Sequence, residues 1–229
     1  MSEDSNQLHP AGTGRTRRPR GSLTPEAILD AAEAVAGPGI DALTMRAVAA
    51  RLGAVPMALY NHFATKEQLV DALLDRVLSR FEPEPATDDW AEDLRRFARA
   101  HRRLLVRHPW AVAPLFTQPN PGLSAVRIGE SALGILRRGG LANARAVAAF
   151  SGIIALNYGW SSFTAARDLD TERPNHDVGA MLARLPPSQF PLTVAVAGEM
   201  GAYGSDVHYD FVLDQLLGGL RATANAEPK

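Results

Sequence analysis

Apolar residues recur at the three-to-four-residue spacing of an amphipathic helix along most of the chain. Prolines separate these stretches. Because proline lacks a backbone donor and clashes with the preceding turn, proline-free spans mark where long helices can run. The strict alternation of apolar and polar residues that is typical of strands is nearly absent. The pattern therefore predicts an all-α fold, with long proline-free spans at 57–82, 86–108, 122–173 and 192–227.

Three short helices are predicted before residue 63. Thr24 followed by Pro25 is typical of a helix start, and Thr44 supplies the hydroxyl of an N-cap for the second helix. Gly53 stands where a left-handed residue ends many helices. The predicted spans are 25–36, 45–52 and 56–62.

Longer helices are predicted in the rest of the chain. Thr65 and Gln68 have the spacing of a capping box, which opens a helix with a broad apolar face that runs to Phe81. The proline-rich stretch 109–121 and the polar segment after residue 167 are expected to be irregular. The other predicted helices span 88–108, 123–138, 143–167, 206–223 and a region near 192–203.

The second and third predicted helices have the composition of a helix-turn-helix. Leu52 and Leu59 are placed to lock the two helices together, while Gly53 and Ala54 let their backbones approach. The run LYNHFATKEQL that starts at Leu59 resembles the L-Y-x-H-F-x-x-K-x-x-L signature of the TetR (tetracycline repressor) family of bacterial transcriptional regulators. With TMRAVAARLG upstream, the resemblance covers about residues 24–74.

The resemblance implies an all-α protein with an N-terminal three-helix DNA-binding domain, a linking helix and a larger helical domain. We expect the larger domain to bind an effector and to dimerise. The implied protein is a homodimeric transcriptional repressor that binds double-stranded DNA. A small molecule releases it from a palindromic operator. The expected boundaries are a disordered basic tail over 1–21, the helix-turn-helix domain over 22–66, the linking helix over 65–81 and the effector-binding domain over 82–229.

The resemblance places the exposed side chains of the third helix in the DNA groove. Asn61 can address adenine and Met57 can meet a thymine methyl, whereas Lys66 suits a phosphate. Phe63 is interpreted as core, and Tyr60 as a packed ring whose hydroxyl reaches a phosphate. The alternative for the polar residues is a solvated surface. The expected DNA contacts are Arg18, Arg20, Met45, Arg46, Met57, Ala58, Tyr60, Asn61, His62 and Lys66.

Charge divides the chain into two unlike parts. The 229 residues carry 24 basic and 25 acidic side chains, and a net charge of −1 alone argues against a general polyanion binder. From Gly14 to Lys66, however, seven basic residues stand against four acidic ones, so this segment is +3 and the remainder is −4. The basic run from Arg15 to Arg20 is either a solvated tail or an arm along DNA.

Val55 departs from the family pattern, because many members have a hydroxyl cap there.

Composition excludes several other functions. The absence of cysteine removes disulfides, thiolate catalysis and cysteine-based zinc sites. The polar N-terminus lacks the apolar core of a secretory signal, and no apolar run is long enough to span a membrane, so a cytoplasmic protein is expected. No hydrolase elbow, zinc-protease, P-loop or dinucleotide motif is present, which disfavours a helical enzyme.

The C-terminal part is expected to supply the dimer surface and the effector pocket. In the family, two helices from each subunit form a four-helix bundle, and the helices from Asn143 and Asp206 are the candidates here. Burial within one chain is the alternative for them. No cofactor is expected, and the effector is unknown. The candidate pocket residues are Phe97, His101, Leu105, Trp110, Phe116, Gln118, Asn157, Tyr158 and Trp160.

Two alternatives concern this C-terminal part. A regulator controlled by a protein partner, or by no effector, would need no cavity there. His101 and His108 lie seven residues apart on one predicted helix, but no third ligand stands at a supporting spacing, so no metal is expected. The segment also resembles the tetracycline repressor's own C-terminal domain without a matching set of metal-chelating residues. Tetracycline itself is therefore not predicted.

Overall fold

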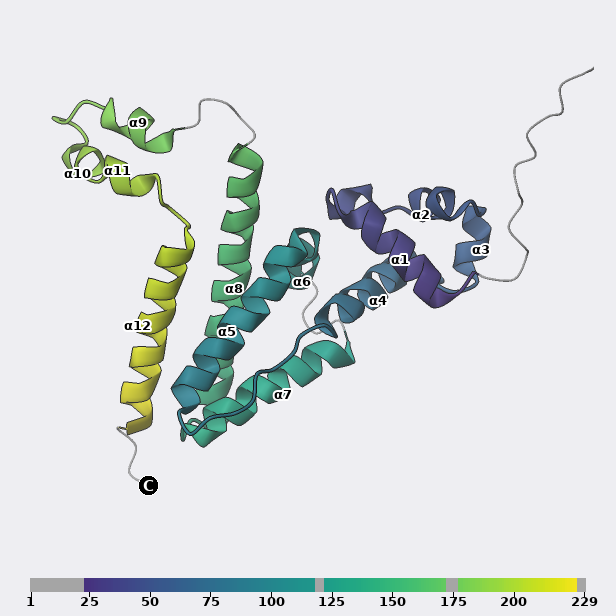
Figure 1. Ribbon diagram of the computed structural model, residues 1–229, viewed down its shortest axis with the longest axis horizontal. Coiled ribbons are helices and arrows are strands. Elements are labelled where there is room, and N and C mark those ends of the chain that lie inside the picture. Colours follow the sequence, from purple (N-terminus) through teal and green to yellow (C-terminus); the bar gives the residue numbers. More distant parts are fainter. Residues whose placement is uncertain (1–22, 118–121, 172–176, 226–229) are drawn as a thin grey trace, which may run out of the picture.

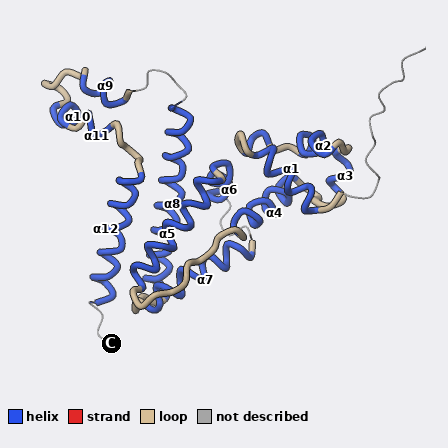
Figure 2. The backbone as a smooth tube through the Cα atoms, in the orientation of Figure 1, coloured by secondary structure: helices blue, strands red, loops and turns tan. Residues whose placement is uncertain are grey.

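The computed structural model describes residues 23–117, 122–171 and 177–225, and within these ranges it contains helices, turns and loops but no strand (Figure 2). The prediction of an all-α fold is confirmed. A small N-terminal head projects from a larger C-terminal body, and helix α4 runs between them (Figure 1).

The helices of the head begin and end at the predicted capping residues. Thr24 Oγ1 accepts a hydrogen bond from the N–H of Ala27 at 3.2 Å, and Thr44 Oγ1 accepts one from the N–H of Ala47 at 3.0 Å. Gly53 has a φ of 65°, the left-handed conformation expected at that helix end. The elements are α1 (Pro25–Ala36), a 3-10 turn (Ile40–Ala42), α2 (Met45–Leu52), α3 (Pro56–Tyr60) and α4 (Lys66–Leu78).

Helix α5 lies at the centre of the body and contacts α7, α8 and α12. It begins after Asp89, whose carboxylate accepts hydrogen bonds from the N–H groups of Ala91 and Glu92 at 3.0 and 3.2 Å. Helix α4 contacts both α1 and α7, so the same helix belongs to the core of the head and to that of the body. The long elements are α5 (Trp90–Arg107), α7 (Leu123–Arg138), α8 (Asn143–Thr171) and α12 (Asp206–Asn225).

Short helices lie where irregular chain or a different span was predicted. After a 3-10 turn (Pro109–Ala111), α6 (Val112–Thr117) forms inside the stretch predicted to be irregular. It tolerates Pro114 because that residue lies in the first turn, where an N–H has no intrahelical partner. Helix α9 (Val178–Ala183) is capped by the side chain of Asp177. The helix expected near 192–203 is divided into α10 (Pro191–Ala195) and α11 (Ala197–Met200).

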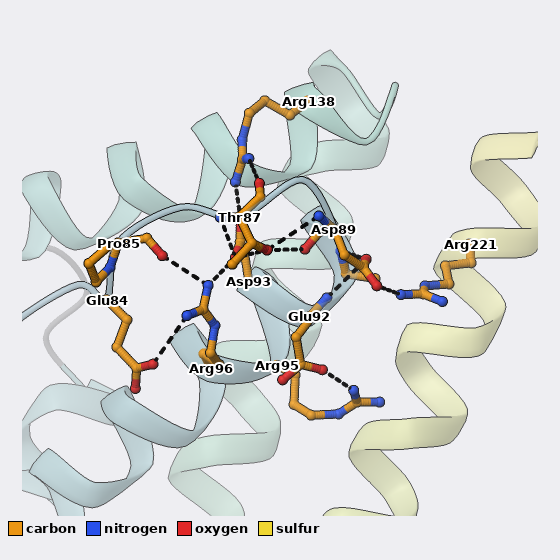
Figure 3. A network of polar contacts seen from close by, with 11 residues as sticks. Glu84, Pro85, Thr87, Asp89, Glu92, Asp93, Arg95, Arg96, Arg138 and Arg221 are labelled. Atoms are coloured by element: carbon orange, nitrogen blue, oxygen red, sulfur yellow. Dashed lines mark hydrogen bonds and ion pairs between the residues drawn. The ribbon is translucent and has the colours of Figure 1, made fainter.

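A charged network joins the helices of the body where α5 begins (Figure 3). Asp93 of α5 is 4% exposed and accepts hydrogen bonds from the hydroxyl of Thr87 at 2.8 Å and from Arg138 of α7 at 2.5 Å, with Arg96 as a further partner. Burial alone would raise the pKa of Asp93, but these hydrogen bonds outweigh it and hold that pKa well below its usual value. The network therefore ties α5 and α7 to the segment that leads into α5.

Candidate DNA-reading surface and ligand cavity

The packing of α2 against α3 fixes the orientation of α3. Leu59 is fully buried and Phe63 is 8% exposed, so the inner side of α3 and the turn after it are anchored in the core of the head. Between the two helices, the N–H of Gly53 donates to the carbonyl groups of Ala49 and Ala50. This tight turn gives the geometry of a helix-turn-helix. The low exposure of Phe63 confirms that it is a core residue.

The opposite side of α3 is exposed. Met57 is 71% exposed and Tyr60 is 43% exposed, and Asn61 and His62 are exposed at the end of the helix. Ala58 is half-buried. This side therefore presents thioether, phenol, amide and imidazole groups, which can address base edges and phosphates.

Two cations flank α3 in the chain. Arg46, at the start of α2, and Lys66, the first residue of α4, are both exposed. The start of α4 is held because Thr65 Oγ1 accepts from the N–H of Gln68 at 3.2 Å, while Gln68 Oε1 accepts from the N–H of Ala64 at 2.9 Å. Lys66 is therefore displayed from a fixed helix start.

Met45, an expected DNA contact, is not part of this exposed surface. Met45 is only 7% exposed and packs in the hydrophobic core of the head, because it is the first inward-facing residue of α2. A side chain buried in this way offers almost no surface to a DNA groove, so Met45 is corrected to a packing residue. Arg18 and Arg20 lie outside the described residues.

A cavity of about 530 Å³ lies among α4, α5, α6, α7 and α8. Its described wall contains no charged side chain, and polar groups come from His101 of α5 and from Ser151 and Tyr158 of α8. A mostly apolar cavity of this size with a few polar groups suits a drug-sized molecule. The other lining residues are Leu78, Leu115, Phe116, Ala125, Val126, Ile128, Gly129, Phe150, Ile154 and Ala155.

Of the predicted pocket residues, His101, Phe116 and Tyr158 line this cavity. Phe116 and Tyr158 meet edge to face, with ring centroids 6.2 Å apart. Gln118 lies outside the described residues. His101, Phe116 and Tyr158 come from α5, α6 and α8, so three of the central helices border one cavity.

The other predicted pocket residues pack elsewhere, which corrects their assignment. Phe97 stacks on the ring of His101 with centroids 6.3 Å apart, and Leu105 and Trp110 are buried in the core. Trp160 donates its indole N–H to the carbonyl of Ser205 at 3.1 Å, toward α12. Asn157 is fully buried and does not line the cavity. Apolar side chains, amphipathic side chains and a buried amide such as that of Asn157 occur in cores and in pockets, so sequence could not separate the two.

The wall formed by α7 was missed. Ala125, Val126, Ile128 and Gly129 lie in its first two turns and line the cavity. The periodic pattern predicted this helix correctly but did not show which neighbour each side would face. The small side chains at Ala125 and Gly129, four residues apart, were the available signal, because they leave space beside larger neighbours.

A buried polar chain connects three helices behind the cavity. Tyr209 of α12 donates its hydroxyl hydrogen to Asn157 Oδ1 at 2.7 Å. Asn157 Nδ2 of α8 lies 3.0 Å from the carbonyl oxygen of Ala98 and 3.0 Å from Nδ1 of His101, both on α5. Burial lowers the pKa of His101 to about 4. The ring is therefore neutral at pH 7.

Helix α4 contacts the cavity wall directly. Leu78 of α4 lines the cavity, and one turn earlier Asp75 Oδ1 accepts a hydrogen bond from the N–H of Ser124, in the first turn of α7, at 2.8 Å. A Cβ at Gly122 would lie 2.3 Å from that carboxylate oxygen, so the backbone of α7 approaches as closely as glycine allows. The helix that supports the head thus caps a helix of the cavity.

A second contact joins the head and the body. Arg80, just after α4, binds the carboxylate of Glu33 on α1 through two hydrogen bonds of 2.5 and 2.6 Å. The same guanidinium lies 2.7 Å from Nε2 of His108, at the end of α5. The orientation of the head is therefore fixed by polar contacts as well as by α4.

The structure was also searched for metal and membrane sites. Among the described residues, no group of three or more histidine, aspartate or glutamate side chains could hold a metal ion. No helix in the described ranges is long and apolar enough to cross a bilayer.

Comparisons with known proteins agree over nearly the whole chain. Residues 28–73 match the family described as bacterial regulatory proteins, tetR family, and residues 82–224 match the family described as tetracyclin repressor-like, C-terminal domain. An HTH-type transcriptional regulator of Saccharopolyspora erythraea is 31% identical, with 90% of this chain and 87% of that protein covered. The repressor DrrR1 of Streptomyces coeruleorubidus is also 31% identical, with 91% of this chain and 82% of that protein covered.

A solved structure shares the fold. ActR of Streptomyces coelicolor, a TetR family protein in complex with actinorhodin, superposes with a TM-score of 0.80 at 27% sequence identity. The match covers 90% of this chain and all of that chain. Both the head and the body therefore have counterparts in a protein that holds a small molecule.

Proposed function

The chain belongs to the TetR family of bacterial regulatory proteins, and from this membership we propose that it is a homodimeric transcriptional repressor that a small molecule releases from DNA. Residues 22–66 form the DNA-binding domain, residues 65–81 hold the linking helix, and residues 82–229 bind the effector and the second subunit. The observation that carries the proposal is the division of α3 into a buried side and an exposed polar side beside a tight turn.

Base reading is assigned to the exposed side of α3. Tyr60, Asn61 and His62 project from a segment that Leu59 and Phe63 anchor in the core. A side chain held in this way reaches a base edge with little loss of conformational freedom on binding. Arg46 and Lys66 neutralise phosphates on either side, and Met57 and Ala58 supply apolar contacts.

A second copy of the chain is proposed to cover one side of α8. Small exposed residues recur there at helical spacing: Ala148, Gly152, Ala155 and Gly159. A Cβ at Gly152 or Gly159 would meet no described atom within 4 Å. Small residues allow close helix packing, and a two-fold dimer would place two reading helices on successive turns of a palindrome.

The effector is assigned to the cavity among α4 to α8. Its apolar wall favours a largely apolar molecule, and the complex of ActR with actinorhodin supports ligand binding by a body of this fold. A ligand that displaces α7 acts on α4 through the contact between Asp75 and Ser124, and one that displaces Leu78 acts on α4 directly. Release from DNA requires that the ligand bind the displaced state more tightly, and each tenfold difference contributes about 1.4 kcal/mol.

The DNA-binding part is tested by selecting duplexes from a random-sequence pool and measuring affinity for the enriched sequence. We expect enrichment of an inverted repeat. The double variant Tyr60→Ala, Asn61→Ala should bind that sequence at least about 30-fold more weakly, since each base contact is worth about 1–3 kcal/mol. Ala34→Ser, an exposed change on α1, is the matched control and should bind normally.

Two results would contradict this assignment. One is unchanged affinity of the double variant while its circular dichroism spectrum and oligomeric state match those of the parent protein. The other is a failure of any sequence to enrich. Sedimentation velocity on the same samples tests the dimer, and a monomer at micromolar concentration would remove the proposed role of α8.

A further inference from the structure

The polar chain behind the cavity determines which nitrogen of His101 carries the hydrogen. The carbonyl of Ala98 can only accept a hydrogen bond, so the Asn157 atom 3.0 Å from it is the amide nitrogen. The hydroxyl of Tyr209, 2.7 Å from the other amide atom, donates to that oxygen. The second hydrogen of the amide nitrogen then points to His101 Nδ1 at 3.0 Å, so Nδ1 accepts. In a neutral ring, the hydrogen therefore lies on Nε2.

Nε2 is the ring nitrogen of His101 that Asn157 does not contact. His101 is 1% exposed and lines the cavity, and no described residue makes a hydrogen bond to Nε2. Among the described residues, three polar side-chain atoms are fully buried without a hydrogen-bond partner: Arg96 Nε, Arg102 Nε and Ser161 Oγ. His101 Nε2 is not one of them, so it is not fully buried in this way. A donor that is neither bonded nor sealed is available to a molecule in the cavity.

The surroundings of this donor determine the chemistry of its partner. The described wall of the cavity contains no cation to stabilise an anion and no carboxylate to accept a ligand ammonium group. A charged group placed beside this donor would therefore find no counterion among the described residues of the wall. The ring of Tyr158 lies with its centroid 6.0 Å from that of His101, and Phe116 lies beyond it, so flat aromatic surfaces flank the donor.

We propose that His101 is a specificity-determining residue whose Nε2–H donates to an uncharged acceptor oxygen, such as a ketone carbonyl, of an aromatic effector. Asn157 and Tyr209 are positioning residues, because they hold the ring in the donor form without contacting the ligand. This inference rests on the proposed ligand cavity. It adds the functional group that the ligand must present and the atom that recognises it.

A matched pair of probes separates this donor from general apolar binding. 9-Fluorenone and fluorene share one tricyclic frame and differ by a carbonyl in place of a methylene group. Affinities for both are measured by equilibrium dialysis at pH 7. The wild type should bind fluorenone more tightly than fluorene. In His101→Leu this preference should fall at least fivefold, while fluorene binds about as before, because only the ketone loses a hydrogen bond.

A conservative variant distinguishes the donor from the shape of the ring. His101→Gln places an amide N–H near the position of Nε2, so it should restore the preference for fluorenone that His101→Leu removes. His208→Gln, on α12 and away from the cavity wall, is the control and should keep the wild-type preference. Equal binding of the two probes by the wild type, or a preference unchanged in His101→Leu, would overturn the donor role of His101. The proposal that the cavity binds a ligand would still stand. Binding of neither probe would overturn the cavity itself.

The hydrogen position can be measured directly in the wild-type chain. Nitrogen NMR of protein labelled with 15N-histidine distinguishes the two neutral ring forms, and the spectrum of His101→Gln identifies the signals of residue 101. We expect the Nε2–H form at pH 7 without ligand. A ring that carries its hydrogen on Nδ1, or a protonated ring, would overturn the proposal even if the leucine variant fails to fold.

Discussion

The side chains proposed to bind DNA and ligand lie outside the core in the head but inside it in the body. In the head, Leu59 and Phe63 form the core while Tyr60 and Asn61 face solvent. In the body, His101 lies inside and is held by Asn157, which is fully buried. The proposed base-reading residues can therefore change with little effect on folding, whereas a change at His101 or Asn157 also alters packing.

Ion pairs give the largest expected difference between the two regions. Asp93→Ala in the body should lower the free energy of unfolding by about 3 kcal/mol, because it leaves Arg96 and Arg138 without their shared buried partner. In the head, Asp30→Ala removes the partner of Arg76 from a pair whose carboxylate is 66% exposed. That change should cost about 0.5 kcal/mol. Urea denaturation of both variants at pH 7 measures the contrast.

The contrast depends on burial. Equal losses in the two variants would show that the network around Asp93 is no better shielded than a surface pair. The head and the body would then not differ in how strongly their ion pairs stabilise them. They would still differ in where the proposed functional residues lie.

Acid should affect the interior of the body through His101. Burial lowers its pKa to about 4 in the folded chain, against about 6.5 for an unfolded histidine. Between these values the unfolded chain takes up a proton that the folded chain does not, so stability is retained above pH 6.5 and is lost as the pH falls. From pH 7 to pH 5 the loss from this residue should be about 2 kcal/mol.

Urea denaturation at the two pH values measures this loss. His101→Gln removes the titrating ring and should reduce the difference between pH 7 and pH 5 by that amount, whatever its stability at pH 7. His62→Gln replaces an exposed imidazole of the head and should retain the wild-type difference. If His101→Gln also retains it, the buried imidazole is not the source of acid sensitivity.

The same division explains what sequence could predict. The head was predictable residue by residue because its signals are local: Thr24 and Thr44 cap their own helices, and Gly53 ends α2. Met45 was the exception, since its family position indicated a contact while its helical spacing indicated the core. The exposed side of α3 also followed from spacing, because Leu59 and Phe63 are four residues apart on the buried side.

The cavity was predictable only in outline. Its wall combines five helices between Leu78 and Tyr158, and the direction in which each helix faces depends on packing across long separations. Asn157 shows the difficulty: a polar residue in an apolar helix suggested a ligand contact, but its amide is occupied by Ala98, His101 and Tyr209. Helix α6 was missed because proline counts against a helix unless the first turn can be located.

Two glycines extend the comparison to the backbone, with effects of opposite sign. Gly53→Ala in the head should cost about 1 kcal/mol, since its φ of 65° is strained for a residue with a Cβ. Gly134→Ala in the middle of α7 should stabilise the body by about 0.5–1 kcal/mol, because helical alanine is favoured and the added Cβ meets no described atom within 4 Å. Thermal unfolding of the two variants reports both signs, and a shift in the same direction would contradict the backbone argument.

The smallest expected effect concerns a single charge on each region. Lys66→Ala should weaken binding to all DNA sequences by a similar factor and reduce the slope of log affinity against log salt by about 1, because one phosphate contact is lost. Arg127→Ala removes an exposed cation from α7 in the body and should leave both quantities unchanged. Fluorescence anisotropy with the selected duplex and a scrambled one, over a series of salt concentrations, measures the slopes. A slope that falls equally in both variants would mean that DNA responds to the overall charge of the protein, and the assignment of phosphate contact to the start of α4 would then be wrong.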